Sequence, residues 1–177
     1  MMLEPSIAPS RNLAALLPME AHSTDEANIF VAGLQHDSRK INSGDLFFAL
    51  PGTLTDGSRY IEQAIQNGAY AVLIDSKGAQ PEMAALSIPV IAVDNLTRQV
   101  GEIAGRFYGK PSKSLDVIAI TGTNGKTSCG RIIAELAEQT EQKCMVMGTT
   151  GYGFSGQLKS ASHTTPDAID IQKMLAW

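Results

Sequence analysis

The sequence predicts an α/β protein built from two domains. In the first part of the chain, short apolar runs typical of strands alternate with segments whose apolar residues recur at helical spacing. The stretch GKPSKS at 109–114 carries Gly, Pro and Ser, interrupts this alternation and indicates a domain boundary. A second strand pattern, a glycine-containing turn and a second helix pattern follow it. We therefore expect a first domain over residues 1–110 and a second over 111–177.

The composition is that of an ordinary globular protein: 44% of the 177 residues are hydrophobic and 18% are charged. A net charge of -4 argues against a basic nucleic-acid-binding surface, and no apolar run is long enough to span a bilayer. The first residues lack the basic and apolar regions of a secretory signal. Cys129 and Cys144 form no C-x-x-C pair, so we expect reduced, buried thiols in a cytoplasmic protein.

The first domain is predicted to contain four strands and two helices. The second of these helices has Asp94 or Asn95 as its N-cap and Gly109 as its C-cap, because both are residue types that favour those positions. The strands are expected at 29–34, 45–50, 70–75 and 89–94, and the helices at 58–69 and 95–109.

The second domain is expected to begin with a βαβ unit. The run LDVIAI at 115–120 is continuously apolar, as in strands that are buried on both faces of a parallel sheet. The next strand is expected at 143–148. Between them, a helix over 126–140 would present one apolar face formed by Cys129, Ile132, Ile133 and Leu136.

The last part of the chain predicts a small hairpin over 152–162 and a final helix over 165–177. Thr165 would be the N-cap of this helix, with Pro166 in its first turn and Asp167 beside the positive end of its dipole. The helix pattern stops at Trp177 without a C-cap, and a two-stranded parallel unit cannot cover both of its faces. We therefore expect the chain to be the front part of a longer protein.

The stretch TGTNGKTS at 121–128 has the residue types that hold a polyphosphate. Gly122 and Gly125 allow the backbone to turn with its N–H groups facing inward, and the start of the following helix adds free N–H donors. Lys126 supplies a positive charge, and the Thr127 hydroxyl can ligate a magnesium ion that bridges the phosphates. The general pattern G-x-x-x-x-G-K-[ST] is not fully met, because Ile120 stands at its first glycine.

These residues resemble the Mur ligases, the ATP-dependent enzymes that build the peptide of bacterial cell-wall precursors. The motif TGTNGKT is similar to their phosphate loop, and residues 37–73, with D-S-R, G-D-L-F-x-A and D-G, resemble the N-terminal domain of the members that add the third and last residues. The stretches VMGTTGYGFSG at 146–156 and HTTPDAIDIQ at 163–172 favour the third-residue ligase, and last-residue ligases typically carry Ser where Thr123 stands.

The resemblance implies roles for individual residues. ATP would be held by Gly122, Thr123, Asn124, Gly125, Lys126, Thr127 and Ser128, with Lys126 catalytic and Thr127 on Mg2+. The UDP-N-acetylmuramoyl-dipeptide would be contacted by His36, Ser38, Thr53, Leu54, Thr55, His163, Thr164 and Thr165. Two simpler interpretations stay open: Asp37 and Arg39 could form only a turn and a surface ion pair, and Thr165 could be only an N-cap.

The reaction that the resemblance implies is ligation of meso-diaminopimelate or L-lysine to UDP-N-acetylmuramoyl-L-alanyl-D-glutamate through an acyl phosphate. The family's amino-acid site and its second metal site lie further along the chain than Trp177, so we expect this chain alone to be inactive. The alternatives are a non-catalytic UDP-sugar or nucleotide-binding module and a fragment of the last-residue ligase. A folylpolyglutamate synthetase is disfavoured by the D-S-R domain.

Overall fold

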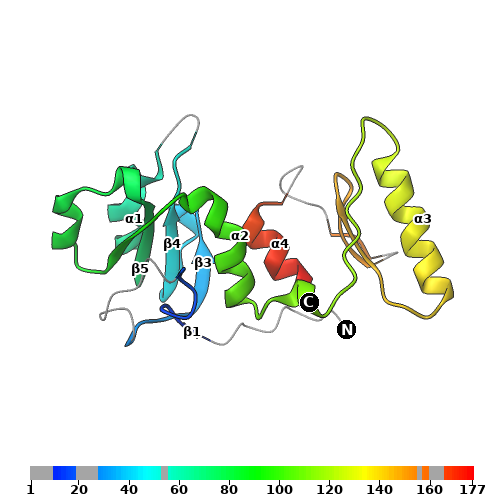
Figure 1. Cartoon of the computed structure of the whole chain (residues 1–177), viewed down its shortest axis with the longest axis horizontal. Coiled ribbons are helices and arrows are strands. Elements are labelled where there is room, and N and C mark those ends of the chain that lie inside the picture. The colour runs from blue at the N-terminus through cyan, green and yellow to red at the C-terminus, as the bar shows by residue number, and fades with distance from the viewer. Residues whose placement is uncertain (1–9, 19–27, 53–55, 155–156, 160–165) are drawn as a thin grey trace. The chain divides into compact units, whose positions relative to one another are not determined.

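The computed structural model describes residues 10–18, 28–52, 56–154, 157–159 and 166–177 (Figure 1). The chain forms two compact units, Met1–Ser114 together with Ala168–Trp177, and Leu115–Asp167. The predicted α/β class is confirmed by the mixture of helices with a parallel sheet. None of the helices in the described part of the chain is long and apolar enough to cross a membrane.

The first unit is built on a four-stranded parallel sheet with the strand order β3-β4-β5-β6 (Figure 1). Its strands are β3 (Gly33–Gln35), β4 (Asp45–Ala49), β5 (Ala71–Asp75) and β6 (Val90–Val93). A separate antiparallel pair joins β1 (Arg11–Asn12) to β2 (Phe30–Val31), so the strand expected at 29–34 is in fact divided between two sheets. The helices of this unit are α1 (Ile61–Gln66), α2 (Leu96–Phe107) and α4 (Ala168–Leu175).

Five short 3-10 helices lie in the described part of the first unit. They are η3 (Ser38–Lys40), η4 (Gly57–Tyr60), η5 (Ser76–Gly78), η6 (Pro81–Ala85) and η7 (Pro111–Lys113). The helix expected over 58–69 is therefore shorter than predicted, because its first turn belongs to η4 and α1 ends at Gln66.

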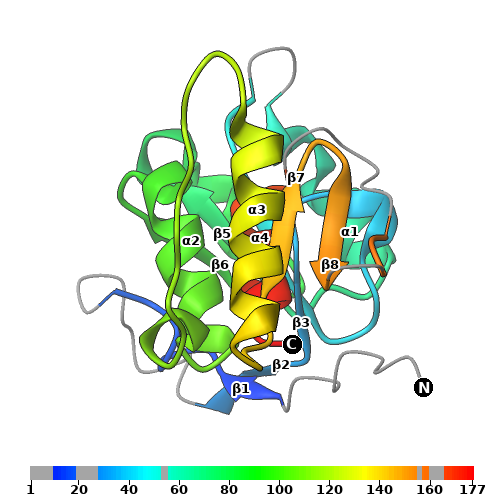
Figure 2. The same cartoon turned by 90° about the vertical axis from the view of Figure 1, so that its right-hand side faces the viewer.

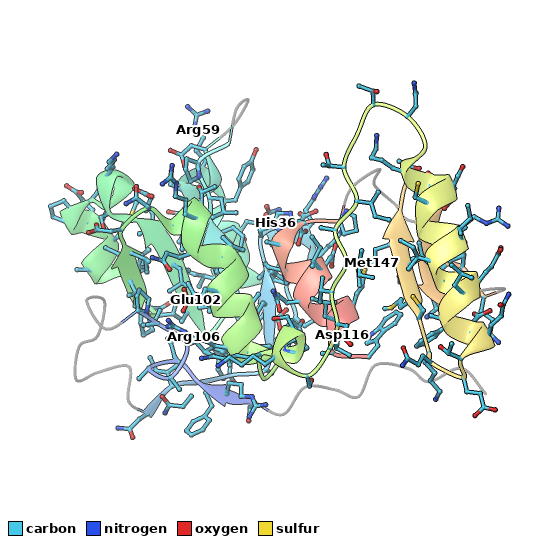
Figure 3. The ribbon with its side chains drawn as sticks, turned by 45° about the vertical axis from the view of Figure 1, so that its right-hand side comes forward. His36, Arg59, Glu102, Arg106, Asp116 and Met147 are labelled. Carbon is cyan, nitrogen blue, oxygen red and sulfur yellow. The ribbon has the colours of Figure 1, made fainter. Side chains whose placement is uncertain are left out.

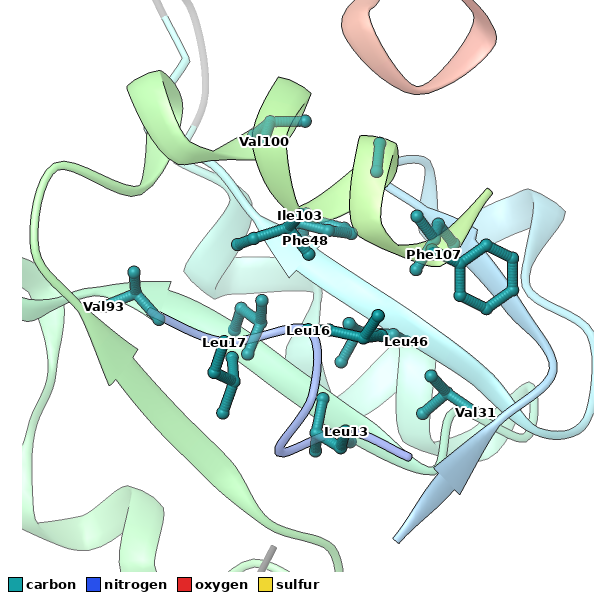
Figure 4. Packing of buried hydrophobic residues seen from close by; sticks show 14 of the residues in the cluster. Leu13, Leu16, Leu17, Val31, Leu46, Phe48, Val93, Val100, Ile103 and Phe107 are labelled. Atoms are coloured by element: carbon teal, nitrogen blue, oxygen red, sulfur yellow. The ribbon is translucent and has the colours of Figure 1, made fainter. Parts of the chain in front are cut away.

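Different elements cover the two faces of the sheet. Successive side chains of a strand point to opposite faces, so each strand contributes to both cores. In β4, Leu46 and Phe48 belong to the core beneath α2, whereas Phe47 and Ala49 belong to the core beneath α1. Figure 4 shows the first of these cores, in which residues of α2 and of the segment around Leu16 meet the sheet. Both faces are apolar, which explains why β4 is buried along its whole length.

The N-terminus of α2 is capped from another element. Asn95 is the N-cap residue, one of the two that the sequence predicted, but it has a left-handed backbone with φ of 52° and its side chain makes no capping bond. Instead, the N–H of Leu96 donates to Asp75 Oδ2 at 3.0 Å. At the other end Tyr108 is the C-cap, and the predicted glycine follows it directly: Gly109 has φ of 82° and its N–H donates to the Arg106 carbonyl at 3.2 Å.

The second unit contains α3 (Lys126–Gln139) and an antiparallel pair, β7 (Met145–Gly148) with β8 (Gly151–Phe154) (Figure 2). The predicted βαβ unit is wrong at its first strand, because residues 115–120 form no strand and pair with none. Only Ile120 of this segment is partly buried, and it faces α3 near Gly130 together with Val146. β7 pairs with β8, which follows it after a short turn, and such a local hairpin needs no long crossover connection. Tyr152 and Lys159 exchange two backbone bonds, as the predicted hairpin requires.

The buried face of α3 differs from the predicted one. Ile132 and Leu136 are 55% and 56% exposed, and Cys129 is also exposed. The less exposed residues are Gly130, Ile133, Ala134 and Ala137, which follow the same helical spacing one residue further on. The expectation of two buried thiols is wrong as well, because Cys144 is only partly buried.

Helix α4 packs on α2 and belongs to the first unit, although the sequence predicted residues 111–177 as one domain (Figure 1). Ile169 of α4 is 6% exposed and lies in the core beneath α2. The helix begins at Ala168, later than predicted, and the expected N-cap Thr165 lies outside the described residues.

Candidate phosphate loop and substrate edge

The segment 121–128 forms an exposed turn that leads directly into α3. Gly122 and Gly125 have φ of 146° and 80°, conformations that a residue with a side chain rarely adopts. A Cβ at Gly125 would meet no atom within 4 Å, so the outer side of the turn is open to a ligand. The first helical bond of α3 runs from the Cys129 N–H to the Gly125 carbonyl at 2.9 Å. The N–H groups of Lys126, Thr127 and Ser128 precede that bond and are the free donors of a helix N-terminus.

The Lys126 side chain folds back over this turn. Its Nζ donates to the Gly122 carbonyl and lies 3.4 Å from the Thr123 carbonyl oxygen, so the positive charge is held above the loop. The Thr127 hydroxyl follows in the first turn of α3. A polyphosphate needs N–H donors and a nearby cation, and magnesium needs oxygen ligands. The residues present therefore fit both groups.

The D-S-R motif forms a tight turn at the carboxyl end of β3. Asp37 caps η3 by accepting from the Arg39 N–H at 3.1 Å, and its two carboxylate oxygens accept from Arg39 Nε and Nη2, both at 2.9 Å. The Arg39 guanidinium lowers the pKa of Asp37 from 3.8 to about 2. Asp37 and Arg39 thus form the turn and surface ion pair that the simpler interpretation described.

Ser38 is held by Gln63 of α1 and by Asn67, the C-cap of that helix, neither of which the sequence singled out. Its hydroxyl donates to Gln63 Oε1 at 2.6 Å, and its carbonyl accepts from Asn67 Nδ2 at 2.8 Å. Ser38 is consequently 6% exposed, whereas the neighbouring His36 is exposed. Gln63 and Asn67 lie one helical turn apart, which is the only sequence signal that could have suggested a shared role.

His36 and Ser38, two of the predicted substrate residues, lie at one edge of the sheet of the first unit. β3 and β4 are adjacent and parallel, so their carboxyl ends lie at the same edge. His36 and Ser38 follow β3, and the segment that carries Thr53, Leu54 and Thr55 follows β4. Figure 3 labels His36 and also Arg59, whose exposed side chain extends from η4. Residues 53–55 lie outside the described part of the chain, as do His163, Thr164 and Thr165.

Asp45 is a buried carboxylate at the amino end of β4, the opposite edge of the sheet from His36 and Ser38, and the sequence analysis did not place it in a site. Its Oδ2 accepts from the Asn42 N–H at 2.8 Å, and it is 6% exposed. Burial raises the pKa of Asp45, although the Asn42 bonds and the charge of Lys173 act in the opposite direction. The G-D-L-F motif therefore has a structural explanation, since Asp45 closes the turn that leads into β4.

An exposed glycine-lysine-threonine turn at a helix N-terminus, in a chain with a parallel-sheet domain, indicates an α/β protein with a candidate phosphate loop. Comparison with known sequences makes the class specific. Residues 30–108 match the model described as "Mur ligase family, catalytic domain", and residues 120–177 match the one described as "Mur ligase middle domain". The chain belongs to the Mur ligase family.

Two curated relatives carry the name UDP-N-acetylmuramoyl-L-alanyl-D-glutamate--2,6-diaminopimelate ligase. The one from Coxiella burnetii is 45% identical over 150 residues, which are 85% of this chain and 30% of the relative. The one from Pseudomonas aeruginosa is 44% identical over 151 residues, which are 85% of this chain and 31% of the relative. The chain thus spans about a third of the length of these relatives.

Solved structures agree with this assignment. A structure of a UDP-N-acetylmuramoyl-L-alanyl-D-glutamate--2,6-diaminopimelate ligase superposes with a TM-score of 0.72 at 29% identity, covering 95% of this chain and 33% of that one. MurF from Acinetobacter baumannii superposes with a TM-score of 0.62 at 18% identity, covering 97% of this chain and 33% of that one, which shows the shared fold.

Proposed function

We propose that this chain is the N-terminal part of a MurE-type ligase, which joins 2,6-diaminopimelate to UDP-N-acetylmuramoyl-L-alanyl-D-glutamate through an acyl phosphate. The observation that carries the proposal is the glycine-lysine-threonine turn at the start of α3, in a chain 45% identical to a relative with that name. The activity, the amino acid and the UDP substrate belong to the whole protein, of which this chain would supply two nucleotide sites.

The phosphate loop would hold ATP with magnesium. The N–H groups at the start of α3 would donate to phosphate oxygens, and Lys126 would move from the loop carbonyls to the phosphates. Thr127 would contribute a hydroxyl ligand to the magnesium ion. When bound, ATP and magnesium supply the phosphoryl group and the charge neutralisation that turn a carboxylate into a reactive acyl donor.

The carboxyl edge of the parallel sheet would hold the UDP end of the other substrate. His36 is exposed there and can contact a ligand directly. The buried Ser38 has committed its hydroxyl proton to Gln63, so it would act on a ligand only as an acceptor or through the shape of the η3 turn. The proposal assigns Thr53, Leu54 and Thr55 to the same substrate, and His163, Thr164 and Thr165 to its sugar-peptide part. We place the protein in the cytoplasm, where ATP is available.

Binding measurements on the 177-residue chain test the proposal. Lys126→Ala should weaken the binding of a fluorescent ATP analogue with magnesium by roughly ten- to hundredfold, because a hydrogen bond to a charged group contributes about 1.5–3 kcal/mol. Lys143→Ala is the matched control, since Lys143 is an exposed lysine of the same unit that precedes β7. Equal affinities of the two variants would overturn the loop assignment.

The second site has its own measurement. UDP-N-acetylmuramoyl-dipeptide should bind equally well to the wild-type and Lys126→Ala chains, because Ser38 and Lys126 lie in different units. We expect no phosphate release that depends on diaminopimelate from the chain alone. Turnover by this chain would contradict the proposal that the activity requires the rest of the protein. Binding of ATP without any binding of the UDP substrate would favour a simple nucleotide-binding module.

A further inference from the structure

Two glycines of α2 form a groove into which α4 fits. Gly101 and Gly105 are one helical turn apart, and so are Ala168 and Gln172 of α4. A Cβ at Gly101 would lie 3.8 Å from the Ala168 Cβ, and a Cβ at Gly105 would lie 3.4 Å from Gln172 Oε1. The absence of side chains at both glycines therefore lets the backbones of α2 and α4 come close along matching rows.

Three further observations support this position of α4. Ile169 is buried in the core that includes Val100, Ile103 and Phe107, so α4 covers apolar surface of the first unit. Lys173 is near enough to Asp45 of β4 for its charge to oppose the upward shift of the Asp45 pKa. Helix α4 also contacts η7, the last element before the second unit begins at Leu115.

These contacts assign α4 to the first unit, which the sequence did not predict. The Mur ligase middle-domain match runs over 120–177 and includes α4, yet α4 packs with the N-terminal unit. The segment Leu115–Asp167, which carries the phosphate loop, consequently leaves the first unit at η7 and returns to it at α4. Because η7 and α4 touch, both ends of that segment are fixed at one place.

We propose that α4 is a clasp. By docking in the Gly101–Gly105 groove, it attaches the C-terminal end of the segment Leu115–Asp167 to the first unit, so that both ends of this segment are anchored. A unit held at both ends explores less space than one held by a single connection, so docking raises its effective concentration near the first unit. The groove is thus an intramolecular docking surface, and its occupant is a helix of the middle-domain sequence. The proposal does not depend on which nucleotide or amino acid the ligase uses.

The Gln172 side chain should weaken this docking. Its Oε1 is buried beside Gly105 and has no hydrogen-bond partner within the described ranges. A buried acceptor without a partner is unfavourable, because it has lost its bonds to water. Gln172→Met keeps the length of the side chain without this acceptor and should strengthen docking. Gly105→Leu places a side chain in the groove and should weaken it.

A disulfide tests whether the helices dock as described. In a Cys129→Ser/Cys144→Ser chain, Gly101→Cys and Ala168→Cys place two Cβ atoms about 3.8 Å apart, the usual separation in a disulfide. The control pair is Glu102→Cys with Ala168→Cys, since Glu102 is exposed on α2 and pairs with Arg106 (Figure 3). Under mild oxidation, the first pair should form an intramolecular bond on the order of tenfold faster than the control pair.

Two further variants test whether the rate of disulfide formation follows the strength of docking. Adding Gly105→Leu to the Gly101→Cys/Ala168→Cys chain should slow disulfide formation severalfold, and adding Gln172→Met should speed it. Equal rates for the test and control pairs would overturn the clasp. If Gly105→Leu prevents folding, the Gln172→Met chain still tests the proposal. A rate of disulfide formation no faster than that of the parent chain would contradict a weakening of α4 docking by the buried Gln172 Oε1.

Discussion

The backbone of Gly57 lies directly against that of Leu50: its N–H donates to the Leu50 carbonyl at 2.9 Å, and a Cβ at Gly57 would lie 2.6 Å from the same oxygen. This contact closes the segment that follows β4, since an isolated bridge joins Pro51 to Asp56. Asp56 caps η4 by accepting from the Ser58 N–H at 2.9 Å. The D-G pair therefore combines a capping residue with a position where no side chain fits.

Gly57→Ala should destabilise the first unit by about 1–3 kcal/mol, because the new methyl group would overlap the backbone of Leu50. Urea denaturation measures the effect as a lower midpoint with an unchanged m-value. Gly78→Ala is the matched control, because a Cβ there would make only ordinary contacts, with Ile74 at 3.7 Å. If both substitutions cost the same, the close approach of Gly57 to Leu50 does not exist in solution.

Gly33 and Asp45 should be energetically coupled across β3 and β4. A Cβ at Gly33 would overlap the Asp45 carboxylate, whose Cγ would lie 3.1 Å away. Gly33→Ala should therefore cost about 1–3 kcal/mol in the wild type and clearly less in an Asp45→Ala background. A double-mutant cycle from denaturation midpoints measures this coupling, and strictly additive effects would contradict the contact.

Asp37 and Asp45 should titrate in opposite directions from the ordinary aspartate. The Arg39 side chain holds the pKa of Asp37 at about 2, so its contribution to stability is present above 3.8 and is lost as the pH falls toward 2. Burial raises the pKa of Asp45, so its contribution is present below 3.8 and is lost as the pH rises through its folded pKa. Carboxyl NMR titration measures both values, and Arg39→Gln should return Asp37 toward 3.8.

ATP should protect Cys129 from alkylation if the loop binds phosphate. Cys129 is exposed in the first turn of α3, and its N–H bonds to Gly125. In the Cys144→Ser chain, a ligand concentration of about ten times Kd leaves about a tenth of the sites free and should slow the maleimide reaction about tenfold. Cys144 directly precedes β7 and is not part of the 121–128 turn, so in the Cys129→Ser chain it should react at an unchanged rate. Protection of both thiols would indicate a general effect instead of a local site.

The sequence predicted the parts of the fold that depend on local patterns. β4, β5 and β6 were expected within one or two residues of their bounds, because continuous apolar runs are typical of buried parallel strands. The cap of α2 could not be predicted in this way, since Asp75 lies in another element and meets Leu96 only in the folded chain. The docking of α4 on α2 also depends on tertiary contacts.

In the candidate site, too, features that depend on local sequence were predicted and those that depend on tertiary contacts were missed. The glycine turn of the candidate phosphate loop was predicted from its residue types, and its two glycines adopt conformations that glycine tolerates best. The bonds between Ser38 and the side chains of Gln63 and Asn67 were missed, because a polar residue on a helix surface gives no signal until its partner is placed beside it. The apolar faces of α3 were ambiguous for a related reason, since the helix carries two apolar stripes and packing chooses between them.

The two units should differ strongly in hydrogen exchange. The amide of Val72 in β5 donates to the Pro89 carbonyl at 2.9 Å and is fully buried between neighbouring strands. Val117 and Ile118 are 58% and 65% exposed and belong to no strand, so their amides lack that protection. In a dilute solution of the chain, we expect the amides of residues 71–74 to exchange orders of magnitude more slowly than those of 117–120. Equal protection of both segments would mean that residues 117–120 pair with another strand in solution, and a loss of protection on dilution would identify that strand as part of a second chain.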